Sequence, residues 1–175
     1  MKTNSVYKAQ AALRDQYKEN PELAMVTDHA ITGGIDPTDP FHSLVEPMDG
    51  CGVSVPVGVH RAVGGLHDSP TPGDLLCAAL AACQDSSVRM VANLLGVELI
   101  SLKVRVKAVV DVRGTMGLQK DVPVGFQSMT CDIDLKVSDD TPPELLARLR
   151  IAAERCCVVQ QTLRCPPPVH TTFHA

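Results

Sequence analysis

The segment from Thr71 to Cys83 constrains the fold of this chain most, because it predicts a helix that is buried on all sides. Residues 75–83 are apolar throughout, and the polar run Gln84-Asp85-Ser86-Ser87 follows directly. A helix that is apolar all round belongs in a protein core. The thiol of Cys83 stands where the apolar run meets the polar one, so it is either a small core side chain or a shielded nucleophile.

The ends of this helix are also marked in the sequence. Thr71 can cap the first turn, Pro72 suits the first helical position, and Asp74 completes a pattern that resembles a capping box. We expect the helix to continue to about Leu95 and to end at Gly96, because glycine commonly follows the last helical turn.

The remaining elements alternate between strands and helices, which predicts an α+β fold. A second long helix opens at residues 141–144 with the same Thr-Pro start, and its expected apolar face is Leu145, Leu149, Ala152 and Cys156. The other expected elements are a helix at 7–17, strands at 23–31, 53–59, 102–110, 129–137 and 169–173, a loop at 33–50 and a connection at 113–124. We expect a single domain in which residues 1–50 form an N-terminal strand and loop segment.

Composition excludes several classes of function. Aromatic residues make up only 3% of the 175 residues, and the formal net charge is −4 with a pI near 5.8. Few stacking platforms and a negative charge argue against a nucleic-acid partner. No apolar run reaches the roughly 20 residues that span a bilayer, and the N-terminus lacks a signal-peptide core. We therefore expect a cytoplasmic protein with no membrane partner.

A disulfide scaffold does not account for the seven cysteines of a cytosolic protein, because cytosolic thiols stay mostly reduced. Cys83 on the first long helix, and Cys156 and Cys157 at the end of the second, could form a peroxidatic and resolving pair if the helices pack together. The alternative is that all are core side chains. A cation that lowers the pKa of Cys83 must come from outside the helix, and Arg61, just before the helix, is a candidate. The alternative is that Arg61 is an exposed charge that only makes the surface soluble. Arg89 is rotated away from Cys83.

A metal site is the rival use of the C-terminal thiols and imidazoles. The candidate ligands are Cys156, Cys157, Cys165, His170 and His174. Adjacent cysteines are an unusual ligand pair, and two histidines four residues apart on a strand lie roughly 13 Å apart. We therefore expect no metal.

Several motifs together resemble the OsmC/Ohr family. Residues 72–83, Pro-Gly-Asp-Leu-Leu-Cys-Ala-Ala-Leu-Ala-Ala-Cys, are similar to its central-helix motif. Residues 124–127, 138–144 and 157–163 resemble its entry to a strand, its acidic lead into the second helix and its Cys-Pro-Val-x-x-Thr-Leu. The resemblance covers roughly Val53 to the C-terminus, so we assign residues 51–175 to an OsmC-like core.

The resemblance implies antiparallel sheets around two central helices in an intertwined homodimer. It also implies a thiol-dependent peroxidase that reduces organic hydroperoxides in oxidative stress defence. Cys83 would be the peroxidatic thiol and Cys157 the resolving one, with Arg61 as the candidate activating cation. A dithiol such as dihydrolipoamide would restore the enzyme, without an organic cofactor or a metal.

Two positions depart from the family pattern. Gly73 stands where better-studied peroxidases carry a glutamate, and Val158 replaces the proline that follows the second cysteine. The sequence therefore leaves an alternative open, a non-peroxidase OsmC-like dimer that binds a small hydrophobic or thiol-reactive ligand. A purely structural dimer is a third, weaker alternative. Whether Cys156 or Cys157 resolves also stays open.

Overall fold

The computed structural model describes residues 5–33 and 36–174, which divide into two compact units. One unit, here called the thiol unit, contains residues 1–10, 79–105 and 131–175. The other, here called the sheet unit, contains residues 11–78 and 106–130.

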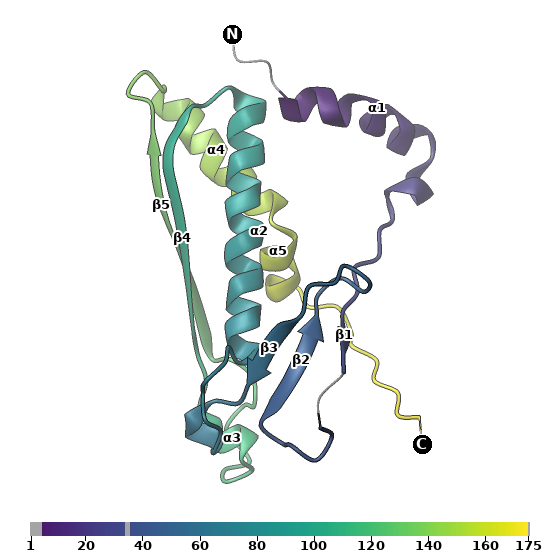
Figure 1. Ribbon diagram of the computed structural model, residues 1–175. Helices are drawn as coiled ribbons and strands as arrows, with labels where there is room; N and C mark the ends of the chain where they lie inside the picture. The colour runs from purple at the N-terminus through teal and green to yellow at the C-terminus, as the bar shows by residue number, and fades with distance from the viewer. Residues whose placement is uncertain (1–4, 34–35, 175) are drawn as a thin grey trace. The chain divides into compact units, whose positions relative to one another are not determined.

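Figure 1 shows the helices and strands along the chain. The helices are α1 (Ser5–Glu19), α2 (Pro72–Leu95), α3 (Val112–Thr115), α4 (Pro143–Cys156) and α5 (Val158–Arg164), with short 3-10 turns η1 (Pro21–Ala24) and η2 (Arg61–Val63). The strands are β1 (Ile31–Thr32), β2 (His42–Glu46), β3 (Val55–Gly58), β4 (Leu99–Val109) and β5 (Ser128–Val137).

The thiol unit has a core made by α2, α4 and the paired strands β4 and β5. Its buried members come from α2, the turn after it, and α4, and are Val88, Val91, Ala92, Val97, Leu149 and Ala153. Alternate residues of the two strands, including Leu102 and Leu135, pack against this cluster. Alternation places one face of each strand on the helices and leaves the other face to polar residues, such as the exposed ion pair Arg105–Asp134.

The predicted ends of α2 are confirmed. Thr71 Oγ1 accepts a hydrogen bond from the Asp74 backbone N–H (3.2 Å), and Asp74 Oδ2 accepts from the Thr71 N–H (2.9 Å) and hydroxyl (2.7 Å). This reciprocal box supplies partners for helix-start donors. At the other end, Gly96 has φ +71°, a conformation that favours glycine, so α2 ends at Leu95.

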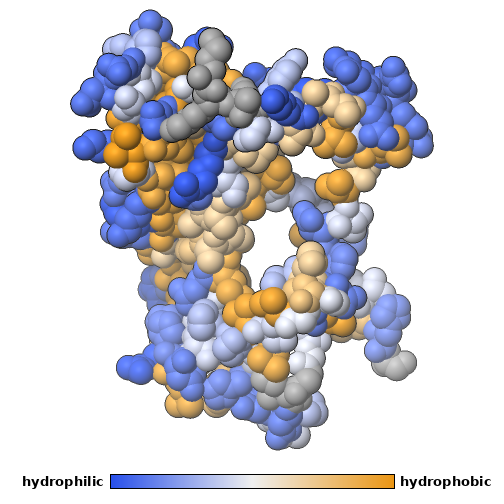
Figure 2. Space-filling model, turned by 45° about the horizontal axis from the view of Figure 1, so that its top comes forward, coloured by the Kyte–Doolittle hydropathy of each residue, from blue (hydrophilic) through white to orange (hydrophobic). Residues whose placement is uncertain are grey.

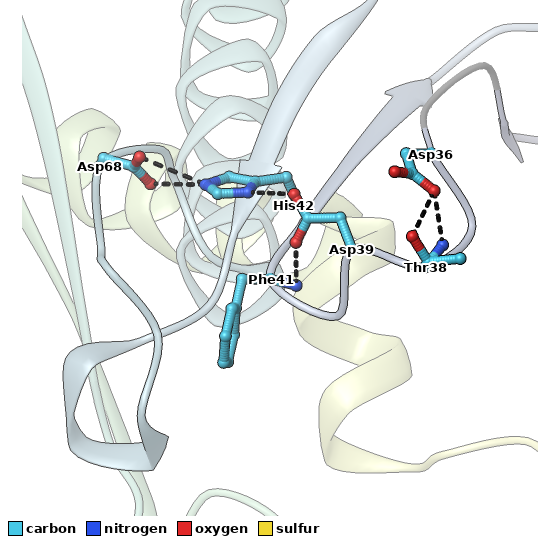
Figure 3. A network of polar contacts seen from close by, with 6 residues as sticks. All are labelled: Asp36, Thr38, Asp39, Phe41, His42 and Asp68. Carbon is cyan, nitrogen blue, oxygen red and sulfur yellow. Dashed lines mark hydrogen bonds and ion pairs between the residues drawn. The ribbon is translucent and has the colours of Figure 1, made fainter.

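The sheet unit is built on three antiparallel strands in the order β1-β2-β3. The segment that follows β3 folds back tightly: a Cβ on Gly65 would lie 2.1 Å from the Val59 carbonyl oxygen, so only glycine fits there. His42 on β2 then connects two loops. Its Nδ1 lies 2.8 Å from Asp39 Oδ2, and its Nε2 lies 3.3 Å from both carboxylate oxygens of Asp68 (Figure 3).

Several sequence predictions are confirmed and others are wrong. The long helices, the helix near the N-terminus and the strands β3, β4 and β5 occur at the expected places. The expectation that the first long helix is buried on all sides is wrong, because only Leu80 of the apolar residues 75–83 is buried. The expected strand at 23–31 is wrong, because the chain forms η1 there and only β1 is a strand. The expected loop at 33–50, of which residues 34–35 lie outside the described part, contains β2. Residues 169–173 join no sheet, and α3 and α5 were not predicted.

Many large apolar side chains of the thiol unit remain at the surface. They come from α2, β4, β5, α4 and α5, and include Met90, Ile100, Ile133, Ile151 and Val158. Figure 2 shows orange, apolar groups at the surface on the left of the view, among blue polar ones. Exposed apolar area of this extent is typical of an interaction surface.

Within the described part of the chain, α2 is the one helix whose length and composition would allow it to cross a bilayer. Its side chains Val88, Val91 and Ala92 instead belong to the packed core of the thiol unit. The core helix of a globular domain commonly passes such a test, so no membrane protein is indicated.

Candidate active site

Cys83 and Cys157 lie together in the thiol unit. Cys83 belongs to the middle of α2, and Cys157 is the residue at which α4 ends and α5 begins. Cys83 lies close enough to Cys157 to raise the pKa of the Cys157 thiol. The structure therefore brings together the two cysteines that the family resemblance implies.

The surroundings of the two thiols differ. The Cys157 side chain is fully buried, whereas Cys83 is half-buried. Burial is the main reason that the pKa of Cys157 rises to about 11, and the Cys83 sulfur raises it further, while the Gln160 backbone N–H opposes the shift. At neutral pH Cys157 therefore keeps its proton and can donate it to the Cys83 sulfur.

The periodicity of α4 explains why Cys157 points inward. Leu149, Ala153 and Cys157 are spaced by four residues and are all buried, with 0%, 1% and 0% exposure. Residues at this spacing share one face of a helix. Cys156, which the sequence placed on the apolar face, is exposed, so that expectation was wrong by one residue position.

Two further residues near the pair were not singled out in the sequence. Cys131 on β5 is half-buried and close enough to Cys157 to raise its pKa, and burial, followed by Asp132, raises the pKa of Cys131 itself. Its inward position in the alternating strand pattern was the available signal. Gln84 follows Cys83, is only 2% exposed, and has no hydrogen-bond partner for Oε1 among the described residues.

Arg61, the candidate activating cation, lies in the sheet unit. It begins η2, is exposed, and donates from Nη2 to the Leu66 carbonyl oxygen (3.2 Å). Its role toward Cys83 stays a prediction. Arg89, which the sequence analysis set aside, is held by Asp85 one helical turn away on α2, at 2.6 Å from Nε to Oδ1.

The start of α2 shows what replaces the family glutamate. A Cβ on Gly73 would lie 3.0 Å from Cζ of Phe126, so an aromatic ring occupies the space beside this position. Asp74 does not substitute for the glutamate, because its carboxylate serves the capping box with Thr71, whose hydrogen bonds lower the pKa of Asp74.

In the described part of the chain, no three or more His, Cys, Asp or Glu side chains are arranged to hold a metal ion.

Comparison with solved structures shows the same fold in several bacterial proteins. An OsmC-like protein from Mycoplasma pneumoniae matches with a TM-score of 0.62 and 10% identity, over 81% of this chain and 89% of that one. An organic hydroperoxide resistance protein from Elizabethkingia anophelis gives 0.58 and 18%, over 81% and 91%. One from Legionella pneumophila gives 0.55 and 20%, over 81% and 91%. A search of curated proteins finds no match.

The sequence itself carries the family pattern as well. The family model described as OsmC-like protein matches residues 65–172, which is more than half of the chain and includes both Cys83 and Cys157. The α+β fold with antiparallel strands agrees with the matched structures. The chain therefore belongs to the OsmC-like protein family.

Proposed function

We propose that this protein is a thiol-dependent peroxidase that reduces organic hydroperoxides, with Cys83 as the peroxidatic thiol and Cys157 as the resolving thiol. The observation that carries the proposal is the proximity of the half-buried Cys83 to the fully buried Cys157. Two of the structural relatives are named organic hydroperoxide resistance proteins, which supports the same substrate class.

The chemistry assigns the first attack to Cys83, because burial keeps Cys157 protonated. The Cys83 thiolate attacks an oxygen of the hydroperoxide, the O–O bond breaks, and an alcohol leaves with a proton, so Cys83 becomes a sulfenic acid. Cys157 then loses its proton and attacks the Cys83 sulfur, and water leaves as the disulfide forms. Oxidation removes the anionic charge from Cys83, which is one of the causes that keep Cys157 protonated.

An external dithiol such as dihydrolipoamide completes the cycle by two exchange steps. Its first thiolate breaks the Cys83–Cys157 bond and forms a mixed disulfide. Its second thiol then attacks this mixed disulfide, which frees the protein thiol and releases the reductant as a cyclic disulfide. Neither a metal nor an organic cofactor enters these steps. We place Cys156 outside these steps, because its side chain is exposed, whereas Cys157 is buried and lies close to Cys83.

The test is a reaction of the fully reduced protein with one equivalent of cumene hydroperoxide, followed by intact-mass measurement and peptide mapping. We expect fast loss of two hydrogens with a Cys83–Cys157 crosslink. Cys83→Ser should abolish hydroperoxide consumption, and Cys157→Ser should stop at the sulfenic acid. A Cys83–Cys156 crosslink would correct the resolving residue, and no oxidation within minutes would overturn the proposal.

The activating role of Arg61 needs its own test. Arg61→Gln should slow hydroperoxide consumption at least tenfold if this guanidinium lowers the pKa of Cys83. A neighbouring cation lowers the pKa of a cysteine by about one to several units. Arg89→Gln is the matched control, since Arg89 is tied to Asp85. Equal rates for both variants would remove Arg61 from the mechanism.

A second function has one observation in its favour. Phe126 occupies the space beside Gly73, where peroxidases of the family carry a carboxylate. We therefore keep the alternative of an OsmC-like dimer that binds a small hydrophobic or thiol-reactive ligand at the same thiols. In the cumene hydroperoxide test this alternative predicts an unoxidised protein in which Cys83 still reacts with iodoacetamide.

A further inference from the structure

A second pair of thiols lies on the outside of the same unit. A pocket of about 430 Å³ sits at the junction of α4 and α5. Its lining residues are Arg155, Cys156, Val158, Gln161, Thr162, Cys165 and Pro167. Both of its cysteines are exposed, in contrast to Cys157 between them.

The junction that forms the pocket is held by Glu154. The Gln161 side-chain amide donates to its carbonyl oxygen (2.9 Å), and the Gln160 amide donates to its carboxylate (3.2 Å). Arg164 pairs with the same carboxylate. These contacts hold the start of α5 against the end of α4. The turn that lines the pocket is therefore fixed by side-chain hydrogen bonds and an ion pair.

The charge of the pocket is set by one guanidinium. Glu154 is neutralised by Arg164, whereas Arg155 is exposed and has no hydrogen bond or ion pair among the described residues. Arg155 and Cys156 both line the pocket. A cation without an ion-pair partner attracts anionic compounds.

We propose that this pocket binds a small anionic disulfide and exchanges with it at Cys156, which becomes a mixed disulfide. The Cys156 thiolate attacks one sulfur of the compound, the S–S bond of the compound breaks, and its other half leaves as a thiolate. The oxidant is thus the low-molecular-weight disulfide itself, and Arg155 binds its carboxylates. Cys156 and Arg155 are exposed and line the pocket, whereas neither Cys83 nor Cys157 does, so the proposal does not rest on the peroxidase function.

The test compares two disulfides on the reduced full-length protein under anaerobic conditions. Glutathione disulfide carries carboxylates, and hydroxyethyl disulfide is uncharged. Peptide mapping over time should show that Cys156 is modified first. The rate with each disulfide is divided by the rate of the same disulfide with a free cysteine peptide. After this correction, glutathione disulfide should react about fivefold faster than hydroxyethyl disulfide. This preference should disappear in 1 M salt, where the Debye length is about 3 Å.

Arg155→Gln should remove the preference for glutathione disulfide and leave the rate with hydroxyethyl disulfide unchanged. Arg150→Gln is the matched control, because Arg150 is an exposed arginine of α4 outside the pocket. Circular dichroism of both variants checks that α4 is intact. Preferential modification of Cys165 or Cys51, or a preference that survives Arg155→Gln, would overturn the proposal.

Discussion

Within the Cys83–Cys157 pair, Cys157 holds its proton more tightly than an ordinary thiol does. Burial raises the pKa of Cys157 to about 11 from an ordinary value of 9.0. At pH 8 this shift leaves about 100-fold less thiolate than an unshifted thiol has. We predict that iodoacetamide at pH 8 labels the exposed Cys156 and Cys165 at least 100-fold faster than Cys157, measured by quenched peptide mapping of the reduced protein.

The control for this labelling prediction is the unfolded chain. In 6 M guanidinium, Cys157 should react as fast as its neighbour Cys156, because burial and the Cys83 contact are gone. Equal labelling of the two residues in the folded protein would contradict the buried position of Cys157.

Gln84 gives a second prediction for a single residue. Its Oε1 is buried without a hydrogen-bond partner among the described residues. An orphaned buried acceptor costs about 1–3 kcal/mol. Gln84→Met keeps the length of the side chain and removes that acceptor, so we expect a gain of about 1 kcal/mol in the free energy of unfolding, measured with urea.

Gln16→Met is the control for Gln84, because Gln16 is an exposed residue of α1 and should change stability by less than about 0.5 kcal/mol. A loss of stability in Gln84→Met would show that Oε1 has a partner in solution. A dimer partner would supply one, and the sedimentation of the variant would reveal it.

At the scale of the elements, the ends of helices affect stability, and the first turn of α2 is the clearest case. Gly73 faces Phe126, whose Cζ lies 3.0 Å from the position of an added Cβ. Replacing a helical glycine by alanine gains up to about 1 kcal/mol. We expect Gly73→Ala to be near neutral in the natural chain and to stabilise the protein in the Phe126→Ala background, by urea unfolding in a double-mutant cycle.

Equal effects of Gly73→Ala in the two backgrounds would show that the ring moves away freely. The same cycle with Gly73→Glu asks whether the family carboxylate can be restored. Faster hydroperoxide consumption only in the double variant would identify Phe126 as the group that excludes the carboxylate.

Two loops are linked through His42, which hydrogen-bonds to the carboxylates of Asp39 and Asp68. The Asp39 hydrogen bond, followed by that of Asp68, raises the pKa of His42 above 6.5. The stabilisation is therefore complete below pH 6.5 and is lost as the pH rises through the raised value. We expect amides of residues 36–46 and 64–70 to exchange more slowly at pH 6 than at pH 9, once intrinsic exchange rates are divided out.

His42→Gln should remove this pH dependence, and His170→Gln, at an exposed position near the C-terminus, should not. Identical protection of both loops at pH 6 and pH 9 in the natural chain would contradict the linkage. The group is partly exposed, so added salt should weaken the effect.

On the scale of the whole molecule, the exposed apolar surface of the thiol unit is typical of an interaction surface. We propose a homodimer, in line with the family resemblance and with exposed side chains such as Met90, Ile100 and Ile133. Sedimentation equilibrium at micromolar concentration should give twice the chain mass of 18.7 kDa. Ile100→Asp should weaken the dimer, whereas Lys103→Asp, on the exposed side of β4, should leave it intact, and a monomeric natural chain would refute the proposal.

Sequence periodicity by itself determined the elements that depend on local patterns. The capping residues Thr71 and Asp74, the stop at Gly96 and the alternation in β4 and β5 are all readable from neighbouring residues. Helix caps and strand alternation involve groups a few positions apart, so the chain needs no tertiary contact to specify them. The resemblance to the family, in addition, implied that Cys83 and Cys157 act as a pair.

Tertiary structure alone decided which side chains meet. The sequence placed Cys156 on the buried face, but packing selected Cys157 through the positions of Leu149 and Ala153. Strand β2 and the loops around His42 depend on pairing with distant residues, which periodicity does not encode. Contacts between residues far apart in the chain, such as Phe126 with Gly73, are set by how the elements pack, and local sequence carries no record of them.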